Sequence, residues 1–236
     1  MPVAALYDVH GNLPALEAVL ADLDAIGVTQ IVSGGDLVGG PLPSECLALL
    51  RERSATFIKG NADRLVLEAA DETDRFARGR LTQEELDEVA AWPATATLEV
   101  EGLGRVLFCH ASPRSDEEIL SVGTPDDVAA AAIAGVSADV VVGGHTHQQY
   151  DRTVAGTRLV NAGSVGLPYE GRPGAYWTLL GPNVEPRRSE YDVATAIDRL
   201  EATGFPRLRE IATPSLLVPI SRDEVIAEHE RNAGRS

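Results

Sequence analysis

The first sixty residues alternate short apolar runs with helical patterns, and this alternation constrains the fold more than any other feature. Apolar runs at 3–7, 31–33 and 56–58 are typical of short buried strands. Between them, one helix is predicted over 12–27, with Asn12 as its N-cap, and a second over about 44–53. Strands that alternate with helices in this way form a sheet whose strands run largely parallel.

The alternation stops after the third predicted strand. Residues 65–91 are acidic and helical, and Thr82 and Glu85 are spaced as a capping box. We therefore expect a small helical cap, inserted directly after the third strand.

The rest of the chain is predicted to be mostly β-structure that ends in helices. One helix begins near Thr124, and helices from Asp192 and Ser221 occupy 192–236. The strands predicted in this part of the chain cover 95–100, 105–109, 139–142, 150–154, 158–161, 175–180 and 184–191. The last four of them are spaced like a meander, in which each strand pairs with the next. At this length, we expect residues 1–236 to form a single domain.

The charge of the chain excludes several classes of partner. Asp and Glu total 36 against 20 Lys and Arg, a net charge of −16. This charge repels duplex nucleic acid and anionic membrane surfaces, whereas a small phosphorylated substrate stays compatible because a bound cation reverses the local sign.

The sequence also indicates where the protein is located. Residues 128–138 form the longest apolar stretch, which is too short to span a bilayer, and the N-terminus has no secretion pattern, so we expect a cytoplasmic protein. Cys46 and Cys109 lack the spacing of a disulfide framework or metal site and are predicted to be buried.

Histidine carries the functional information. Of the five histidines, only His229 lies within a helical pattern, where we expect it to face solvent. The others directly follow predicted strands, and ligands bind at the carboxyl ends of strands in open α/β sheets, so these four side chains are predicted to converge: His10, His110, His145 and His147.

Carboxylates and an amide accompany these histidines. Asp8 precedes His10 by two residues, as His145 precedes His147, and in extended backbone such pairs point to the same side. Asp36 and Asn61 follow two further strands, with Asp63 as a lesser candidate. Nitrogen and oxygen donors without thiolate favour Mn, Fe, Zn or Ni. Seven donors exceed one tetrahedral site, but with one bridging carboxylate they make two half-sites for metals about 3.5 to 4 Å apart, the usual arrangement for hydrolysing phosphate esters.

These blocks resemble a known family in order and spacing. Asp8-Val9-His10-Gly11-Asn12, Gly35-Asp36, Gly60-Asn61-Ala62-Asp63, His110 and Gly144-His145-Thr146-His147 are similar to the calcineurin-like metallophosphoesterases over about 1–180. The chain's size and the turn at 161–166 resemble the small bacterial phosphodiesterase branch. The resemblance implies an α/β fold, a four-layer α/β/β/α sandwich of two mixed sheets with a small helical insertion.

The resemblance also implies the roles of the candidate ligands. Asp8, His10 and His147 would hold one transition-metal ion. Asn61, His110 and His145 would hold a second, and Asp36 would bridge the two. Asp36 and His110 are the residues we assign to catalysis itself, and manganese is among the expected metals.

Two positions depart from the family pattern. The family often has a histidine after the Asn of its third block, placed to protonate the leaving oxygen or to bind the phosphoryl group, where this chain has Ala62. Because a methyl group donates no proton, we expect substrates whose leaving group departs without help. The phosphoprotein phosphatase branch has an Asp-Arg-Gly, whose Arg binds phosphate, where this chain has Gly39-Gly40-Pro41, and this difference weakens the case for a phosphoprotein phosphatase. Arg64 could partly replace that Arg. Asp63 and Arg64 are equally well explained as adjacent charges that open a helix.

The sequence therefore predicts a dinuclear metal-dependent phosphodiesterase that acts by in-line attack of a metal-bridging hydroxide. A phosphomonoesterase or nucleotide pyrophosphatase with the same metals is the nearest alternative. A non-catalytic metal-binding scaffold of the same fold is the alternative from a different functional class. The apolar segment 215–220 serves either core packing or a homodimer contact, and the sequence leaves this open.

Overall fold

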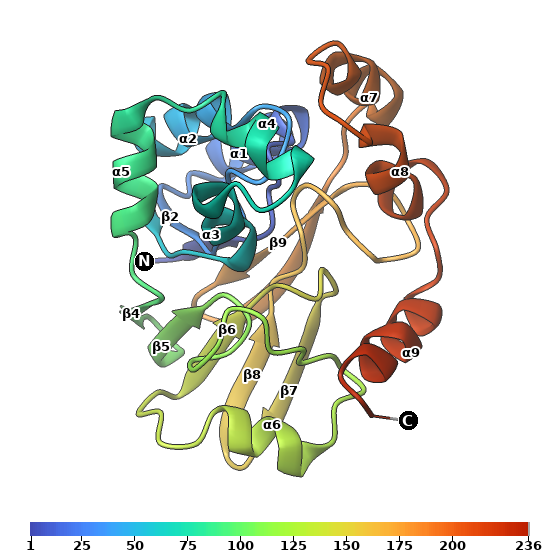
Figure 1. Cartoon of the computed structure of the whole chain (residues 1–236). Helices are drawn as coiled ribbons and strands as arrows, with labels where there is room; N and C mark the ends of the chain where they lie inside the picture. Colours follow the sequence, from blue (N-terminus) through green and yellow to red (C-terminus); the bar gives the residue numbers. More distant parts are fainter. Residues whose placement is uncertain (236) are drawn as a thin grey trace.

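The computed structural model describes residues 1–235 and contains two five-stranded sheets (Figure 1). The first sheet has the order β10-β9-β1-β2-β3. Its strands β1, β2 and β3 run parallel, as the βαβαβ pattern predicts, whereas β9 and β10 join it antiparallel. The strands and their two crossover helices span β1 Val3–Leu6, α1 Leu13–Ile26, β2 Gln30–Ser33, α2 Pro43–Glu52, β3 Thr56–Phe57, β9 Ala175–Leu180 and β10 Val184–Ser189.

The second sheet has the order β4-β5-β6-β8-β7 and is also mixed. Its strands β5, β6 and β8 are parallel, and each edge carries one antiparallel strand. Helix α6 lies on its outer side, at the bottom of Figure 1. These elements span β4 Thr95–Val100, β5 Gly104–Cys109, α6 Asp126–Ala132, β6 Val140–Gly143, β7 Tyr150–Val154 and β8 Thr157–Asn161.

Side-chain alternation along the strands creates the layers. In β1, Ala4 and Leu6 pack toward α1 and α2, while Val3 and Ala5 face the second sheet. In β6, Val141 faces the outer cluster that contains Ala129 of α6, and its neighbours on either side face the first sheet. The molecule therefore has helices, sheet, sheet and helix in sequence, which confirms the predicted four-layer α/β/β/α class.

The predicted cap region is helical throughout. It contains α3 Asn61–Glu68, α4 Glu72–Arg78 and α5 Gln83–Ala91, seen at the upper left of Figure 1. The Thr82 hydroxyl accepts a hydrogen bond from the Glu85 backbone N–H, and the Glu85 carboxylate accepts one from the Thr82 N–H, which is the predicted capping box.

The meander prediction is wrong. Strands β7 and β8 form a hairpin in the second sheet, but β9 and β10 form a hairpin in the first. Spacing along the chain predicts local pairing of neighbouring strands, but the sheet edge that a hairpin joins depends on contacts with distant strands. Here β9 pairs with β1, at the opposite end of the sequence.

The C-terminal residues form more structure than the sequence indicates. Beyond α7 Val193–Glu201, helix α8 Leu208–Ala212 continues into a π-helical turn at Thr213–Leu217, before α9 Arg222–Asn232. Within the segment 215–220, Leu216 is buried in a cluster with Ile197 and so serves core packing. Val218 of the same segment is 68% exposed. Within the described residues, none of the helices is both long and apolar enough to cross a membrane.

Candidate metal centre

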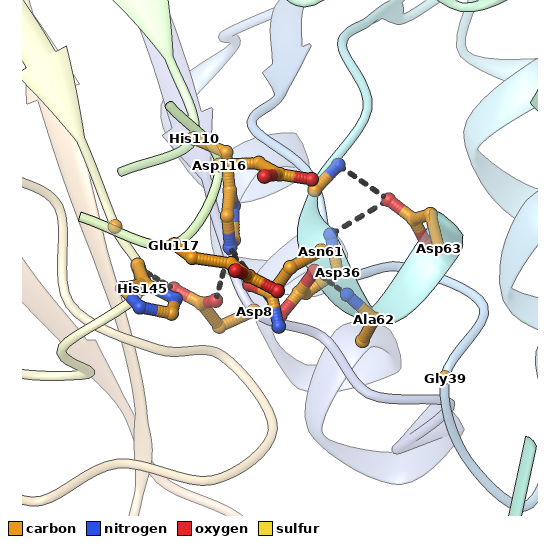
Figure 2. A network of polar contacts seen from close by, with 12 residues as sticks. Asp8, Asp36, Gly39, Asn61, Ala62, Asp63, His110, Asp116, Glu117 and His145 are labelled. Carbon is orange, nitrogen blue, oxygen red and sulfur yellow. Dashed lines mark hydrogen bonds and ion pairs between the residues drawn. The ribbon is translucent and has the colours of Figure 1, made fainter. Parts of the chain in front are cut away.

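The seven predicted ligands lie together where strands of both sheets end. Figure 2 shows Asp8, Asp36, Asn61, His110 and His145 among them. Asp8 and His10 follow β1, Asp36 follows β2 and Asn61 begins α3 after β3, all in the first sheet. The ligands from the second sheet follow β5 and β6 and are His110, His145 and His147. Because the two sheets pack face to face, their carboxyl ends deliver these side chains to one place.

Asp36 occupies the middle of this group. Its Oδ2 atom lies 3.3 Å from Nε2 of His110 and 3.7 Å from Nε2 of His10. Its Oδ1 atom accepts a hydrogen bond of 2.7 Å from the backbone N–H of Ala62. The carboxylate therefore touches histidines from both predicted half-sites.

One half-site contains three converging donors. The Nε2 atoms of His10 and His147 are 3.3 Å apart, and Asp8 Oδ1 lies 3.4 Å from Nε2 of His147. Asp8 Oδ2 accepts a 2.9 Å hydrogen bond from the backbone N–H of His145, but Oδ1 is buried and has no hydrogen-bond partner within the described residues. A buried carboxylate oxygen without a donor is costly unless it binds a cation.

The other half-site is built around the Asn61 amide. One atom of this amide lies 3.0 Å from Nε2 of His110 and 3.0 Å from Nδ1 of His145. Both amide orientations have a use at this position. The nitrogen can donate to the imidazoles, and after a 180° rotation of the amide the oxygen is a metal ligand.

Backbone carbonyls orient three of the imidazoles. Nδ1 of His10 lies 3.2 Å from the carbonyl oxygen of Gly39, and Nδ1 of His110 lies 3.0 Å from that of Gly34. Nδ1 of His147 lies 2.7 Å from the carbonyl oxygen of Leu167. A carbonyl only accepts, so each Nδ1 carries a proton and each Nε2 faces the centre, where a metal ion would displace any proton it holds. Three Nε2 atoms directed at one place beside an orphaned carboxylate oxygen fit metal ions.

The backbone at the ligands does not match the extended conformation that the i, i+2 spacing predicted. Five ligands have left-handed φ angles: Asp8 53°, His10 47°, Asp36 54°, His145 65° and His147 57°. Such residues cost about 1 to 3 kcal/mol each and persist only where their surroundings hold them. Here Asp8 and His10 donate backbone hydrogen bonds of 3.1 and 2.9 Å to the carbonyls of Gly35 and Asp36. The paired ligands converge because their loops turn sharply, not because they continue the strands.

A glycine permits the close approach of two of these loops. A Cβ atom on Gly40 would lie 1.9 Å from the carbonyl oxygen of His10. The Gly39-Gly40-Pro41 segment, which stands where the phosphatase branch has its Asp-Arg-Gly, therefore lets the His10 loop pack directly against its backbone.

Asp63 is a positioning residue, which resolves one alternative that the sequence left open. Its buried carboxylate accepts four backbone hydrogen bonds, from the N–H groups of Asp36, Leu37, Val38 and Gly60, at 2.8 to 2.9 Å. Figure 2 shows this carboxylate pointing away from the histidines. It joins the Asp36 loop to the start of α3 and so places Asp36 beside Asn61.

Arg64 is engaged by acids. Its guanidinium donates to Asp116 at 2.8 Å and to Glu117 at 2.7 Å, and it also pairs with Glu68. The reading of Arg64 as a charge at a helix opening therefore describes it better than a free phosphate contact.

Burial and mutual attraction set the charges of the centre. Burial raises the pKa of Asp36, but the neighbouring His110, His10 and His145 outweigh it and hold that pKa below its ordinary value. Burial lowers the pKa of His110, but the Asp36 carboxylate outweighs it and raises that pKa to about 10. Burial lowers the pKa values of His10 and His145. The carboxylates are therefore ionised at neutral pH, as metal ligands must be.

His229 does not face solvent as predicted. Its ring is half-buried and packs edge-on against Tyr169, with ring centroids 6.3 Å apart. Tyr169 in turn stacks on the His147 ring at 5.2 Å. Burial lowers the pKa of His229 to about 4, with the His147 and His145 imidazoles adding to the effect. Sequence reasoning missed Tyr169 because no strand or motif marks it.

Cavities flank the centre on two sides. One of about 200 Å³ includes His10 and Ala62 in its lining. The other, of about 250 Å³, includes His110, Lys59 and Arg114. A group held at the centre thus has space on both sides.

Known proteins are similar to this chain in sequence and in fold. A family model described as the calcineurin-like phosphoesterase superfamily domain matches residues 1–180. The chain is 28% identical over 234 residues to an uncharacterized protein of Methanocaldococcus jannaschii, covering 86% of this chain and 93% of that one. It resembles the crystal structure of a metallophosphoesterase from Sphaerobacter thermophilus, with a TM-score of 0.73 and 27% identity, covering 90% of this chain and 98% of that one. A hypothetical protein from Pyrococcus horikoshii has a TM-score of 0.80 at 21% identity, covering 90% and 96%, and this likeness shows the fold alone.

Proposed function

This chain belongs to the calcineurin-like phosphoesterase superfamily, and from that premise we propose that it is a dinuclear metal-dependent phosphodiesterase. The observation that carries the proposal is the position of Asp36, whose Oδ2 lies within 4 Å of histidines from both half-sites. A shared carboxylate between two sets of imidazoles is the ligand arrangement that two neighbouring transition-metal ions require.

Each ligand has a proposed role. Asp8, His10 and His147 hold one ion, Asn61, His110 and His145 hold the other, and Asp36 bridges them. Manganese, iron, zinc and nickel all suit these donors. When bound, such a pair supplies a hydroxide for in-line attack on phosphorus and neutralises charge on the phosphoryl oxygens.

Neither of the two residues that follow Asn61 can protonate the leaving group. Ala62 presents a methyl group, and its backbone N–H is already used by Asp36. Asp63 is also unavailable, because its carboxylate is occupied by backbone N–H groups and points elsewhere. The enzyme should therefore favour esters of acidic alcohols and phenols over those of ordinary alcohols.

Space on both sides of the centre favours a diester. A phosphodiester carries two organic groups, and the two cavities that include His10 and His110 in their linings offer a place for each. Arg64, the sequence's partial replacement for the phosphatase arginine, pairs with three carboxylates and so is not free to clamp the dianion of a monoester. Monoesterase or nucleotide pyrophosphatase activity is therefore the second candidate.

We further propose that the described residues act as one domain in which α4 and the C-terminal helices border the substrate cleft. Thr73 and Asp74 of α4 line the same cavity as Leu200 of α7.

A paired measurement tests the proposed function. Purified protein loaded with Mn²⁺ is analysed for metal content and assayed with bis(4-nitrophenyl) phosphate and with 4-nitrophenyl phosphate. We expect two ions per chain and faster turnover of the diester. Preference for the monoester would support the second candidate, and metal binding without turnover of either ester would indicate a scaffold.

A further inference from the structure

The cavity beside His10 has walls of two origins, and we call it the apolar subsite. One wall belongs to the metal-centre loops and includes His10, Gly39 and Ala62. The opposite wall comes from the C-terminal helices, beyond the residues that the family model matches, and consists of Leu200, Phe205, Leu208, Ile211 and Leu216.

The apolar subsite opens directly onto the proposed reaction centre. His10 contributes its imidazole to the ligand cluster and also lines the cavity. Ala62 lines it too, and the Ala62 N–H donates to the Asp36 carboxylate at 2.7 Å. A phosphoryl group held beside Asp36 therefore places one of its ester substituents in this cavity.

The lining contains no cation to receive a second anionic group. Among residues 1–235, neither Lys nor Arg contributes to this lining, and the only carboxylate in it is that of Asp74. A polyphosphate chain or a nucleotide with further phosphates would meet apolar carbon and a like charge there. The chemistry of the walls fits a neutral hydrocarbon group instead.

The size of the cavity limits this group. A cavity of about 150 Å³ lined by Leu, Ile and Phe side chains accommodates one benzene ring. The apolar subsite, at about 200 Å³, matches one aromatic ring or an alkyl group of similar size.

We propose that the apolar subsite selects phosphodiesters in which one ester group is a single aryl ring or a compact alkyl group. This inference rests on the proposed function and adds its substrate class. The hydrophobic group is bound by a segment outside the metal-ligating blocks, so preference for it can be altered without changing any proposed ligand.

The kinetic test varies one ester group and keeps the leaving group constant. Methyl, butyl, phenyl and thymidine-5′ esters of 4-nitrophenyl phosphate are compared with the Mn²⁺-loaded full chain. We expect KM for the phenyl ester to be about tenfold lower than for the methyl ester, because the ring is removed from water. The thymidine ester should resemble the methyl ester.

The variant Ile211→Trp fills the cavity from the half-exposed side of α8. It should raise KM for the phenyl ester to at least the wild-type value for the methyl ester. Ile211→Asn, which adds polarity without bulk, is the second variant. Ile26→Trp, at an exposed position on α1, is the matched control and should retain the preference.

A binding measurement separates this inference from the proposed function. Ligand-observed NMR with benzyl alcohol should show saturable binding to the wild-type chain and to Ile26→Trp, but not to Ile211→Trp. If no ester is hydrolysed while this pattern holds, the phosphodiesterase proposal fails and the hydrophobic site stands. Equal KM values for methyl and phenyl esters, or benzyl alcohol binding that Ile211→Trp does not change, would overturn the subsite.

Discussion

The metal-centre loops and the C-terminal helices face each other across the apolar subsite, but different interactions hold them. In the loops, strained residues such as His10 and Asp36 are fixed by backbone hydrogen bonds and by the buried Asp63 carboxylate. The C-terminal helices instead contribute apolar side chains, and exposed ion pairs such as Arg199 with Glu17 tie them to the rest. A rigid polar network holds the proposed ligands in one arrangement, whereas the proposed subsite is formed by apolar side chains that can be exchanged without changing a ligand.

The largest effect is expected from Asp36→Asn, which tests whether the polar network carries the reaction. The amide cannot bridge two cations, and loss of several kcal/mol of charge stabilisation lowers kcat on bis(4-nitrophenyl) phosphate by about 10³-fold. Metal analysis should find one ion or fewer per chain. Asp151→Asn, a carboxylate paired with Arg158 in β8, is the control. Full activity of Asp36→Asn would contradict the bridging role.

A smaller effect is expected from adding the missing proton donor. In the wild-type chain, the rate should fall steeply as the leaving alcohol becomes more basic, so that aryl esters react well and alkyl esters poorly. Ala62→His should raise the rate on an alkyl diester by about 10²-fold and flatten this dependence. Ala62→Gln provides similar bulk without an efficient acid. Equal wild-type rates on aryl and alkyl esters would show that another residue donates the proton.

Asp63→Ala tests whether the loops need their internal support. It leaves four buried N–H groups without their acceptor, and we expect a loss of about 3 kcal/mol in the free energy of unfolding. Mn²⁺ affinity should also fall about 10- to 100-fold, because Asp36 is no longer held in place. Urea denaturation and metal titration measure the two effects. Asp192→Ala, the N-cap of α7, should cost about 1 kcal/mol and leave metal affinity unchanged.

The smallest effect belongs to the C-terminal side and concerns stability alone. Arg235, Ser121 and Thr124 hold the Glu230 carboxylate, and the pKa of Glu230 is lowered to about 2, with the Arg235 contact as the largest cause. A carboxylate with a lowered folded-state pKa stabilises the protein above its unfolded pKa and loses that contribution as the pH falls from about 4.5 toward 2.

Partial solvent exposure of the Glu230 network reduces the expected contribution to about 1 kcal/mol. The loss of unfolding free energy between pH 5 and pH 3, measured by urea denaturation, should be smaller by about 1 kcal/mol in Glu230→Gln than in the wild-type chain. Glu228→Gln, at an exposed position of the same helix, should behave as wild type. Hydrolysis of the methyl ester at neutral pH should not change. A change in that activity would break the division between the two regions.

Much of the fold could be predicted because it follows from local patterns. The apolar runs of β1 and β2, the N-cap at Asn12 and the capping box at Thr82 depend on residues close together in the chain, and the structure contains each. The predicted meander is wrong for β9 and β10 because this hairpin joins the first sheet through the pairing of β9 with β1, which lies far away in the sequence.

The seven candidate ligands could be selected from the sequence because donor chemistry and position after a strand are both visible there. Their function in metal binding stays a prediction, but their proximity in space is a property of the structure. The backbone rationale for the Asp8 and His10 pair was wrong. Left-handed φ angles at non-glycine residues are maintained by hydrogen bonds between loops, which no local pattern records.

The sequence by itself determined the family, the two-sheet class and the donor types at the ends of the strands, because periodicity and side-chain chemistry are local properties. Only the tertiary structure decided that Asp63 supports the Asp36 loop, that His229 packs beside Tyr169 and that the C-terminal helices close a cavity over Ala62. These features arise from contacts between residues far apart in the chain, and such contacts form only when the sheets and helices have packed.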